Sequence, residues 1–208
     1  MCFINRFLTL DDDIIPYLYE AGFGYVGIVI SGTKLLPPLI NVLLEQWRPE
    51  THTFHFPCVE ATITLEDVTY YLGLPVDENP ITSIAHGNWK NLCEELLGHT
   101  PTPDDLDERK IYIKFLDDKF TQLPVDAALK IKLQFARAYI LQVTGGILMP
   151  DKSRNKVHLM WLYHPLDLRA AKNKSWRSTV LAFLFRELCK DVHLNKQAIG
   201  GCLMLLQS

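Results

Sequence analysis

The feature that most constrains the fold of this chain is a helical hydrophobic period in its second half. Between Val125 and Val143, apolar residues recur at spacings of four and three: Leu129, Leu133, Ala136, Ile140 and Val143. Polar residues lie off that stripe: Lys130, Lys132, Gln134 and Arg137. This pattern predicts an amphipathic helix that crosses the core, and Gly145 and Gly146 are expected to break it.

A second long helix is predicted near the C-terminal end of the chain. Ser175 is placed to cap it, and its apolar face repeats every four residues, at Trp176, Val180, Leu184 and Leu188. With 48% hydrophobic residues, a chain of 208 residues can bury a sizeable core. One globular, mainly α domain spanning residues 1–208 is therefore the simplest organisation.

Shorter helices are predicted in the first 120 residues. The expected segments are 11–21, 37–48, 64–73, 89–97 and 107–120. Pro37 suits the first turn of the second segment, and Pro49 ends it. Thr64 and Asp67 have the spacing of a capping box. The glycine-rich stretch 22–32 contains a G-x-G-x-x-G spacing, but the helix predicted at 11–21 precedes it, where dinucleotide binding requires a strand, so a loop is expected.

A small β-hairpin is predicted within the helical chain, near residues 51–65. Segments 51–56 and 61–65 alternate in period two, with Phe54 and Phe56 on one face. The expected fold is thus a single multi-helix domain with one inserted hairpin.

Composition excludes several classes of protein. The net charge of −3 gives no global basic field, so any contact with nucleic acid needs a local patch. Five scattered cysteines without a C-x-x-C pair predict neither a disulfide framework nor a zinc knuckle. No apolar stretch approaches the roughly 18 to 20 residues of a membrane span, and the first ten residues do not resemble a secretory signal. We expect an intracellular protein that does not bind membranes.

The densest local basic cluster is DKSRNK at residues 151–156. Lys152, Arg154 and Lys156 alternate there, in a turn-rich stretch that follows two glycines. Contact with phosphate or with a partner is one interpretation. The alternative is a solvated connector in which Asp151 and Asn155 set the turn geometry.

Several long strings stand out along the chain. They include WRPETHTFHFP at 47–57, EATITLEDVTYYLGLPV at 60–76, WKNLCEELLG at 89–98 and FARAYILQVTGGILMPDKSRNKVHLMWL at 135–162. Two more are SWRSTVLAFLFRELC at 175–189 and IGGCLMLLQS at 199–208. Together these strings resemble the plant mobile domain family over nearly the whole chain. The resemblance assigns a structural signature around the hairpin, which comprises Trp47, Arg48, Glu50, His52, Phe54, Glu60 and Asp67.

The resemblance implies a domain of transposable elements and of host genes derived from them. Members act in the nucleus, in gene and transposon silencing and in meristem maintenance. We therefore expect nuclear silencing proteins as partners, with weak nucleic-acid contact as the alternative role. Members normally continue beyond this end, so the resemblance also implies a C-terminal truncation, with Ile199, Leu203, Leu205 and Leu206 packed inward.

Enzymatic roles are disfavoured by the residues themselves. The family is also named aminotransferase-like, yet Lys152 is the only faint candidate for a pyridoxal phosphate lysine, and no alternating βαβ pattern surrounds it. The metal-binding strings of a phosphatase are absent. On a strand, His52 and His55 point to opposite faces and cannot share a zinc ion with Cys58. We expect no catalytic residue, no metal, no cofactor and no small-molecule substrate.

Overall fold

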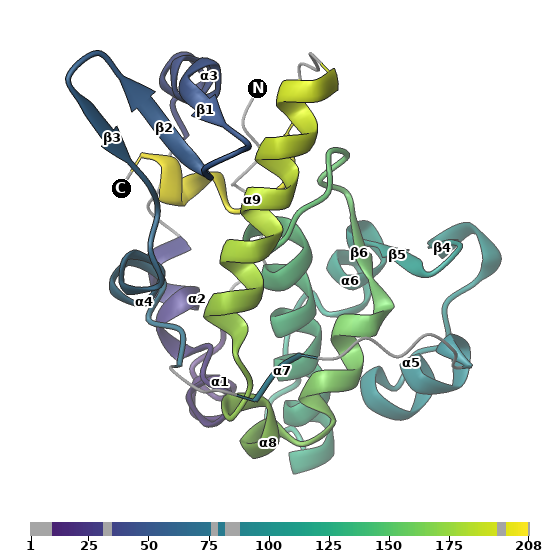
Figure 1. Ribbon diagram of the computed structural model, residues 1–208. Helices are drawn as coiled ribbons and strands as arrows, with labels where there is room; N and C mark the ends of the chain where they lie inside the picture. The colour runs from purple at the N-terminus through teal and green to yellow at the C-terminus, as the bar shows by residue number, and fades with distance from the viewer. Residues whose placement is uncertain (1–9, 31–34, 76–78, 82–87, 195–198, 208) are drawn as a thin grey trace.

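The computed structural model describes residues 10–30, 35–75, 79–81, 88–194 and 199–207. The protein is mainly helical, with two small antiparallel sheets on opposite sides of α9 in the view of Figure 1. The helix α9 (Trp176–Leu194) packs against the N-terminal half of the chain. Its predicted face is confirmed, because Trp176, Val180, Leu184 and Leu188 are fully buried.

The other long helix, α7 (Leu129–Val143), packs against segments from both halves of the chain. Its second half is buried from Ala138 to Val143, which confirms a core-crossing helix. The predicted start at Val125 is wrong, because Val125 is exposed and the helix begins four residues later. Leu129 is also exposed, so the apolar stripe reaches the core only beyond the first turn.

Gly145 and Gly146 do not break this helix. The chain continues from α7 into a π-helical turn, η2 (Thr144–Leu148). A Cβ atom on Gly145 would lie 2.2 Å from the Cβ atom of Val157, so the glycine allows another segment to pack directly on the helix backbone. The glycine pair therefore provides a close contact, and the interpretation of these residues as helix breakers is wrong.

The first third of the chain forms α1 (Ile15–Glu20), α2 (Gly24–Ile30), α3 (Pro37–Gln46) and α4 (Leu65–Leu72). The expected loop at 22–32 is wrong, since α2 occupies most of it. Gly22 ends α1 with a φ of 83°, and Gly24 lets the Tyr19 ring lie where a Cβ atom would clash, at 2.4 Å. Glycine here permits close helix packing.

The capping box of α4 is confirmed. Thr64 N donates to Asp67 Oδ2 at 2.8 Å, and Asp67 N donates to Thr64 Oγ1 at 3.2 Å. At the other end, Gly73 adopts a left-handed φ of 60° and donates its N–H to the Thr69 carbonyl oxygen. Both ends of this helix therefore follow from local sequence.

The predicted hairpin is confirmed and gains a third strand, but the strand expected at 61–65 is wrong in its bounds, because β3 ends at Ala61 and α4 begins at Leu65. The first sheet has the order β1 (Trp47–Arg48), β2 (Thr53–Phe56) and β3 (Val59–Ala61), all antiparallel. Phe54 is paired with Trp47 on one side and with Ala61 on the other. The strand at 47–48 ends α3 at Gln46, so the expected helix limit at Pro49 is two residues too late.

A second sheet corrects the helix predicted at 107–120. Its strands are β4 (Leu106–Asp107), β5 (Lys110–Tyr112) and β6 (Lys156–His158), and only α6 (Ile113–Lys119) is helical. Glu108 has a φ of 54°, which lets the chain reverse between β4 and β5. The central pair joins Ile111 to Val157, a partner too distant in sequence for a local pattern to reveal.

The remaining elements complete the core. They are α5 (Trp89–Leu97), η1 (Pro103–Asp105), η3 (Leu159–Leu166), α8 (Leu168–Lys172) and η4 (Leu203–Leu206). The apolar C-terminal residues expected to pack inward are buried: Ile199, Leu203, Leu205 and Leu206. Within the described ranges, no helix combines the length and apolar character needed to cross a membrane.

Candidate functional site

The strongest candidate site is a cleft of about 740 Å³ between α9 and the strands β5 and β6. The basic segment 151–156 contributes to its lining through Asp151, Lys152, Ser153 and Lys156. Cations outnumber carboxylates in its wall, which contains Lys110, Lys152, Lys156, Arg186 and Lys190 against Asp151 and Glu187. We call this feature the basic cleft.

Lys152 and Lys156 of the predicted cluster both line the basic cleft, and each has an acidic neighbour. Lys156 Nζ donates to Asp107 Oδ2 at 2.7 Å, and this hydrogen bond raises the pKa of the lysine. The same ammonium lies 4.9 Å from the centre of the Tyr112 ring. The buried Nζ of Lys152 lies 3.8 Å from Asp191 Oδ1. Both lysines are therefore held by the fold.

Arg154, the third residue of the cluster, does not belong to the cleft wall. Its Nη2 donates to the Ile199 carbonyl oxygen at 3.3 Å, and its φ of 52° is left-handed. Asp151 Oδ1 accepts the N–H groups of Ser153 and Arg154 at 3.0 Å each. Asp151 thus sets the geometry of the turn.

The structure adds three cations that sequence reasoning missed, because they come from β5 and α9. Lys110 Nζ donates to Asp151 Oδ2 at 2.7 Å. Lys190 Nζ donates to Glu187 Oε1 at 2.8 Å, and Arg186 Nε lies 3.6 Å from the same oxygen. Burial raises the pKa of Asp151, but the hydrogen bonds from Lys110 and Ser153 outweigh it, and the carboxyl stays ionised at neutral pH.

The floor of the basic cleft is apolar. It is formed by Met149, Met160, Trp161 and Phe183. Trp161 is 8% exposed and packs on Trp176, with ring centres 6.2 Å apart. The guanidinium of Arg186 lies 4.5 Å from the centre of the Phe183 ring. The cleft therefore combines these four apolar residues, which we call its floor, with charged side chains, an arrangement suited to binding an amphipathic ligand.

His158 is the imidazole of the basic cleft. Burial lowers its pKa, and the positive charges of Lys110 and Arg109 lower it further. The imidazole is therefore neutral at neutral pH. Its Nδ1 accepts the N–H of Met160 at 3.1 Å, so Nε2 carries the proton and is available as a donor.

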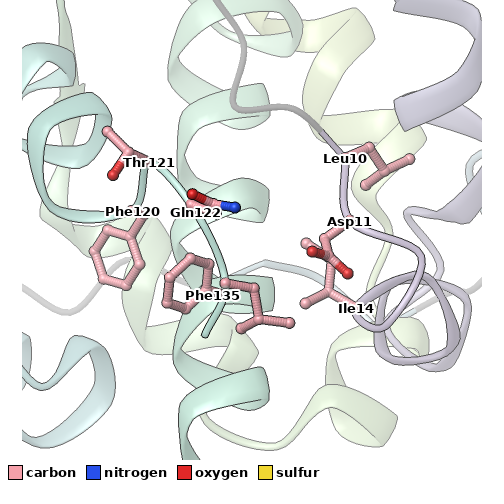
Figure 2. A pocket seen from close by; sticks show the side chains of 8 residues that line it. Leu10, Asp11, Ile14, Phe120, Thr121, Gln122 and Phe135 are labelled. Carbon is pink, nitrogen blue, oxygen red and sulfur yellow. The ribbon is translucent and has the colours of Figure 1, made fainter. Parts of the chain in front are cut away.

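A second cavity, of about 440 Å³, lies between the chain preceding α1 and the segment around Phe120 (Figure 2). Figure 2 shows Asp11 and Ile14 on one side, with Gln122 and Phe135 on the other. Asp11 is its one charged residue among those described, and Asp11 Oδ1 accepts the N–H of Asp13 at 3.0 Å. This cavity offers less functional chemistry than the basic cleft.

The aromatic members of the signature form a packed cluster on the first sheet. Trp47 is fully buried and lies 4.8 Å from Phe54 and 5.2 Å from Phe185 between ring centres. His52 has a left-handed φ of 56° and stacks on Phe185 at 5.5 Å. These contacts fix the sheet to α9.

The charged members of the signature are not assembled into one site. Arg48 is exposed and donates to the carbonyl oxygens of Glu45 and Trp47, while Glu50 is exposed. Glu60 Oε1 accepts hydrogen bonds from Thr53 at 2.6 Å and lies 3.0 Å from His55 Nε2. Asp67 belongs to the α4 capping box.

Metal-ligating side chains do not gather in the part of the chain that is described. No group of three His, Cys, Asp or Glu residues is placed there to hold an ion. His52 stacks on α9, whereas His55 faces Glu60.

Comparison with known proteins identifies the domain. The model of the plant mobile domain family matches residues 23–208. A serine/threonine-protein phosphatase 7 long form homolog of Arabidopsis thaliana is 41% identical over 95% of this chain. Protein MAIN-LIKE 2 and Protein MAINTENANCE OF MERISTEMS, of the same plant, are 35% and 34% identical over 93% and 95% of it. No solved structure matches significantly.

These relatives are much longer than the region they share with this chain. The matched region makes up 15% of the phosphatase 7 homolog, 29% of MAIN-LIKE 2 and 41% of MAINTENANCE OF MERISTEMS. The match to the family model nevertheless covers most of the sequence, including both sheets and the basic cleft. The chain therefore belongs to the plant mobile domain family.

Proposed function

We propose that this domain is a non-enzymatic interaction module that acts as a nuclear scaffold in gene and transposon silencing and in meristem maintenance. The observation that carries the proposal is the reuse of the domain. It accounts for 15% of a relative named as a phosphatase homolog and for 41% of one named for maintenance of meristems. A domain that makes up such different shares of its relatives is suited to recruiting partners in each of them.

The chemistry of the basic cleft supports a binding role. Its carboxylates Asp151 and Glu187 are engaged by lysines, and the imidazole of His158 is held by a backbone N–H. Burial raises the pKa of Cys93 and of Cys202 to about 12, so both remain weakly nucleophilic thiols at neutral pH. Paired charges around an apolar floor favour recognition over group transfer.

Affinity purification of the tagged chain from plant nuclei tests this proposal. A scaffold recovers the same partner proteins before and after nuclease treatment, because protein contacts do not need nucleic acid. Recovery that disappears after nuclease treatment, or an exclusively cytoplasmic tagged chain, would contradict the nuclear scaffold.

A second candidate function is contact with nucleic acid through Lys152, Arg154 and Lys156. It is favoured by the excess of cations in the wall of the basic cleft, which two of these residues line. Duplex binding should then weaken with salt, by roughly 0.9 log unit of slope for each phosphate contact. Replacing the three residues by alanine should make that slope shallower, provided that circular dichroism shows an intact fold.

A further inference from the structure

The described lining of the basic cleft contains five cations and two carboxylates, and part of the compensating negative charge lies outside this lining. Asp107 and Asp191, which neighbour Lys156 and Lys152, do not belong to the described lining. The chain as a whole has a net charge of −3, so the positive cleft is a local reversal. A negatively charged ligand is complementary to such a wall.

Three cations are placed to contact a ligand. The side chains of Lys110, Arg186 and Lys190 are 38%, 57% and 50% exposed, against 31% for Lys152 and 20% for Lys156. An ammonium group has three hydrogens, and both Lys110 and Lys190 use one of them on a carboxylate. These three residues therefore form the accessible rim.

The floor of the cleft is suited to a large apolar side chain. Met149 and Met160 are flexible and polarisable, and such residues adapt to varied apolar partners. A volume of about 740 Å³ accommodates several side chains of a short peptide segment. The ligand is thus expected to combine carboxylates with at least one apolar anchor.

The aromatic residues of the floor do not favour nucleic acid. Binding of single strands relies on open aromatic faces on which bases stack. Trp161 is nearly buried against Trp176, and Arg186 covers a face of Phe183. A peptide needs apolar area rather than a free ring face, so the floor fits a peptide better.

We propose that the basic cleft binds a short acidic segment of a partner protein, with one large apolar side chain on the methionine floor and carboxylates on Lys110, Arg186 and Lys190. This inference rests on the proposed scaffold function and names the chemistry of the partner.

A random peptide display library tests the specificity of the whole chain. Selection on the wild type should enrich peptides that contain several Asp or Glu residues around one Leu, Ile, Met or Phe. A fluorescent copy of the best peptide then measures affinity. A 20-nucleotide oligo(dT) strand serves as the nucleic-acid probe.

Two variants connect that binding to the basic cleft. Lys110→Gln combined with Arg186→Gln should weaken peptide binding about tenfold, as expected for two lost charge-assisted contacts. Asp151 keeps its hydrogen bonds from Ser153 and Arg154, and Glu187 keeps its hydrogen bond from Lys190, so folding should be retained.

Met160→Glu should also weaken peptide binding, because it places a negative charge in the apolar floor. The matched control, Lys114→Gln with Lys130→Gln, removes two exposed cations outside the cleft and should leave affinity unchanged.

Other outcomes overturn the inference. Selected peptides without acidic residues, or equal losses in the cleft and control variants, exclude an acidic ligand in this cleft. Tight oligo(dT) binding that only the cleft variants lose would assign the cleft to nucleic acid. If the Lys110 and Arg186 variant still recovers nuclear partners without nucleic acid, the scaffold function stands and the cleft inference fails.

Discussion

Figure 1 shows the first sheet on one side of α9 and the second sheet, whose strands β5 and β6 border the basic cleft, on the other; the first sheet and the cleft are built in different ways. The first sheet comes from one continuous stretch, residues 47–61, and its aromatic side chains seal it onto the helix. The cleft draws its wall from β5, from segment 149–161 and from α9. The first sheet is thus local and is held to α9 by aromatic packing, whereas the basic cleft is assembled from charged and apolar residues that are distant in the sequence.

This difference indicates where stability and binding reside. Trp47, a member of the signature, is fully buried and packs the first sheet against α9. Arg186 lies within the family string at 175–189, but only its neighbours in space place it in the wall of the basic cleft. Substitutions on the two sides of α9 should therefore separate effects on unfolding from effects on binding.

The largest expected effect is on the signature side. Trp47→Ala removes a fully buried ring that packs on Phe54 and Phe185, and it should cost about 3 to 5 kcal/mol of unfolding free energy. Urea denaturation followed by circular dichroism measures the loss. Trp47→Phe is the control and should cost much less. A loss below about 1 kcal/mol for alanine would contradict the structural role assigned to this cluster.

A smaller effect is expected where the long helix supports the second sheet. Gly145→Ala places a methyl group 2.2 Å from Val157 Cβ, and such overpacking costs about 1 to 3 kcal/mol. Combining it with Val157→Gly should recover part of that loss, because the second change removes Val157 Cβ, at 2.2 Å, and Cγ2, at 2.5 Å. A double-mutant cycle on thermal unfolding measures the coupling. Purely additive losses would mean that the two residues do not touch.

The capping box of α4 should contribute about 1 kcal/mol. Asp67→Ala removes the acceptor of two hydrogen bonds of 2.8 Å, one donated by Thr64 N–H and the other by Thr64 Oγ1–H. Chemical denaturation measures the change. Glu66→Ala, at the neighbouring exposed position of the same first turn, is the matched control and should fall within about 0.5 kcal/mol of the wild type.

The smallest effect should appear in the pH dependence. Burial lowers the pKa of His99, His158 and His164 in the folded protein. The unfolded chain therefore binds more protons below its ordinary histidine pKa of about 6.5, and stability should fall as the pH is lowered through that value. Denaturation between about pH 7.5 and 5.5 measures the slope. His158→Asn should flatten this slope relative to that of the wild type. Identical slopes would exclude His158 as a contributor.

The sequence by itself determined the elements whose cause is local. The buried face of α9 follows from a four-residue period, the hairpin from alternation around Phe54, and the α4 cap from Thr64 and Asp67. Each signal arises from residues within a few turns of one another, so a linear pattern carries it. Lys152 and Lys156 were also identified as candidate contacts, and the structure places both in the basic cleft.

The tertiary structure decided what depends on distant partners. Arg137 lies off the apolar stripe of α7, yet it is half-buried, and its guanidinium donates to the carbonyl oxygens of Pro165 at 3.0 Å and Leu166 at 2.9 Å. Local sequence predicts Gly145 as a helix breaker, but in the fold its missing side chain allows Val157 to pack directly on the helix backbone. Contacts between segments distant in the sequence also pair β5 with β6 and bring Lys110 and Arg186 into one cleft. Long-range packing selects these arrangements, and residue spacing along the chain does not encode it.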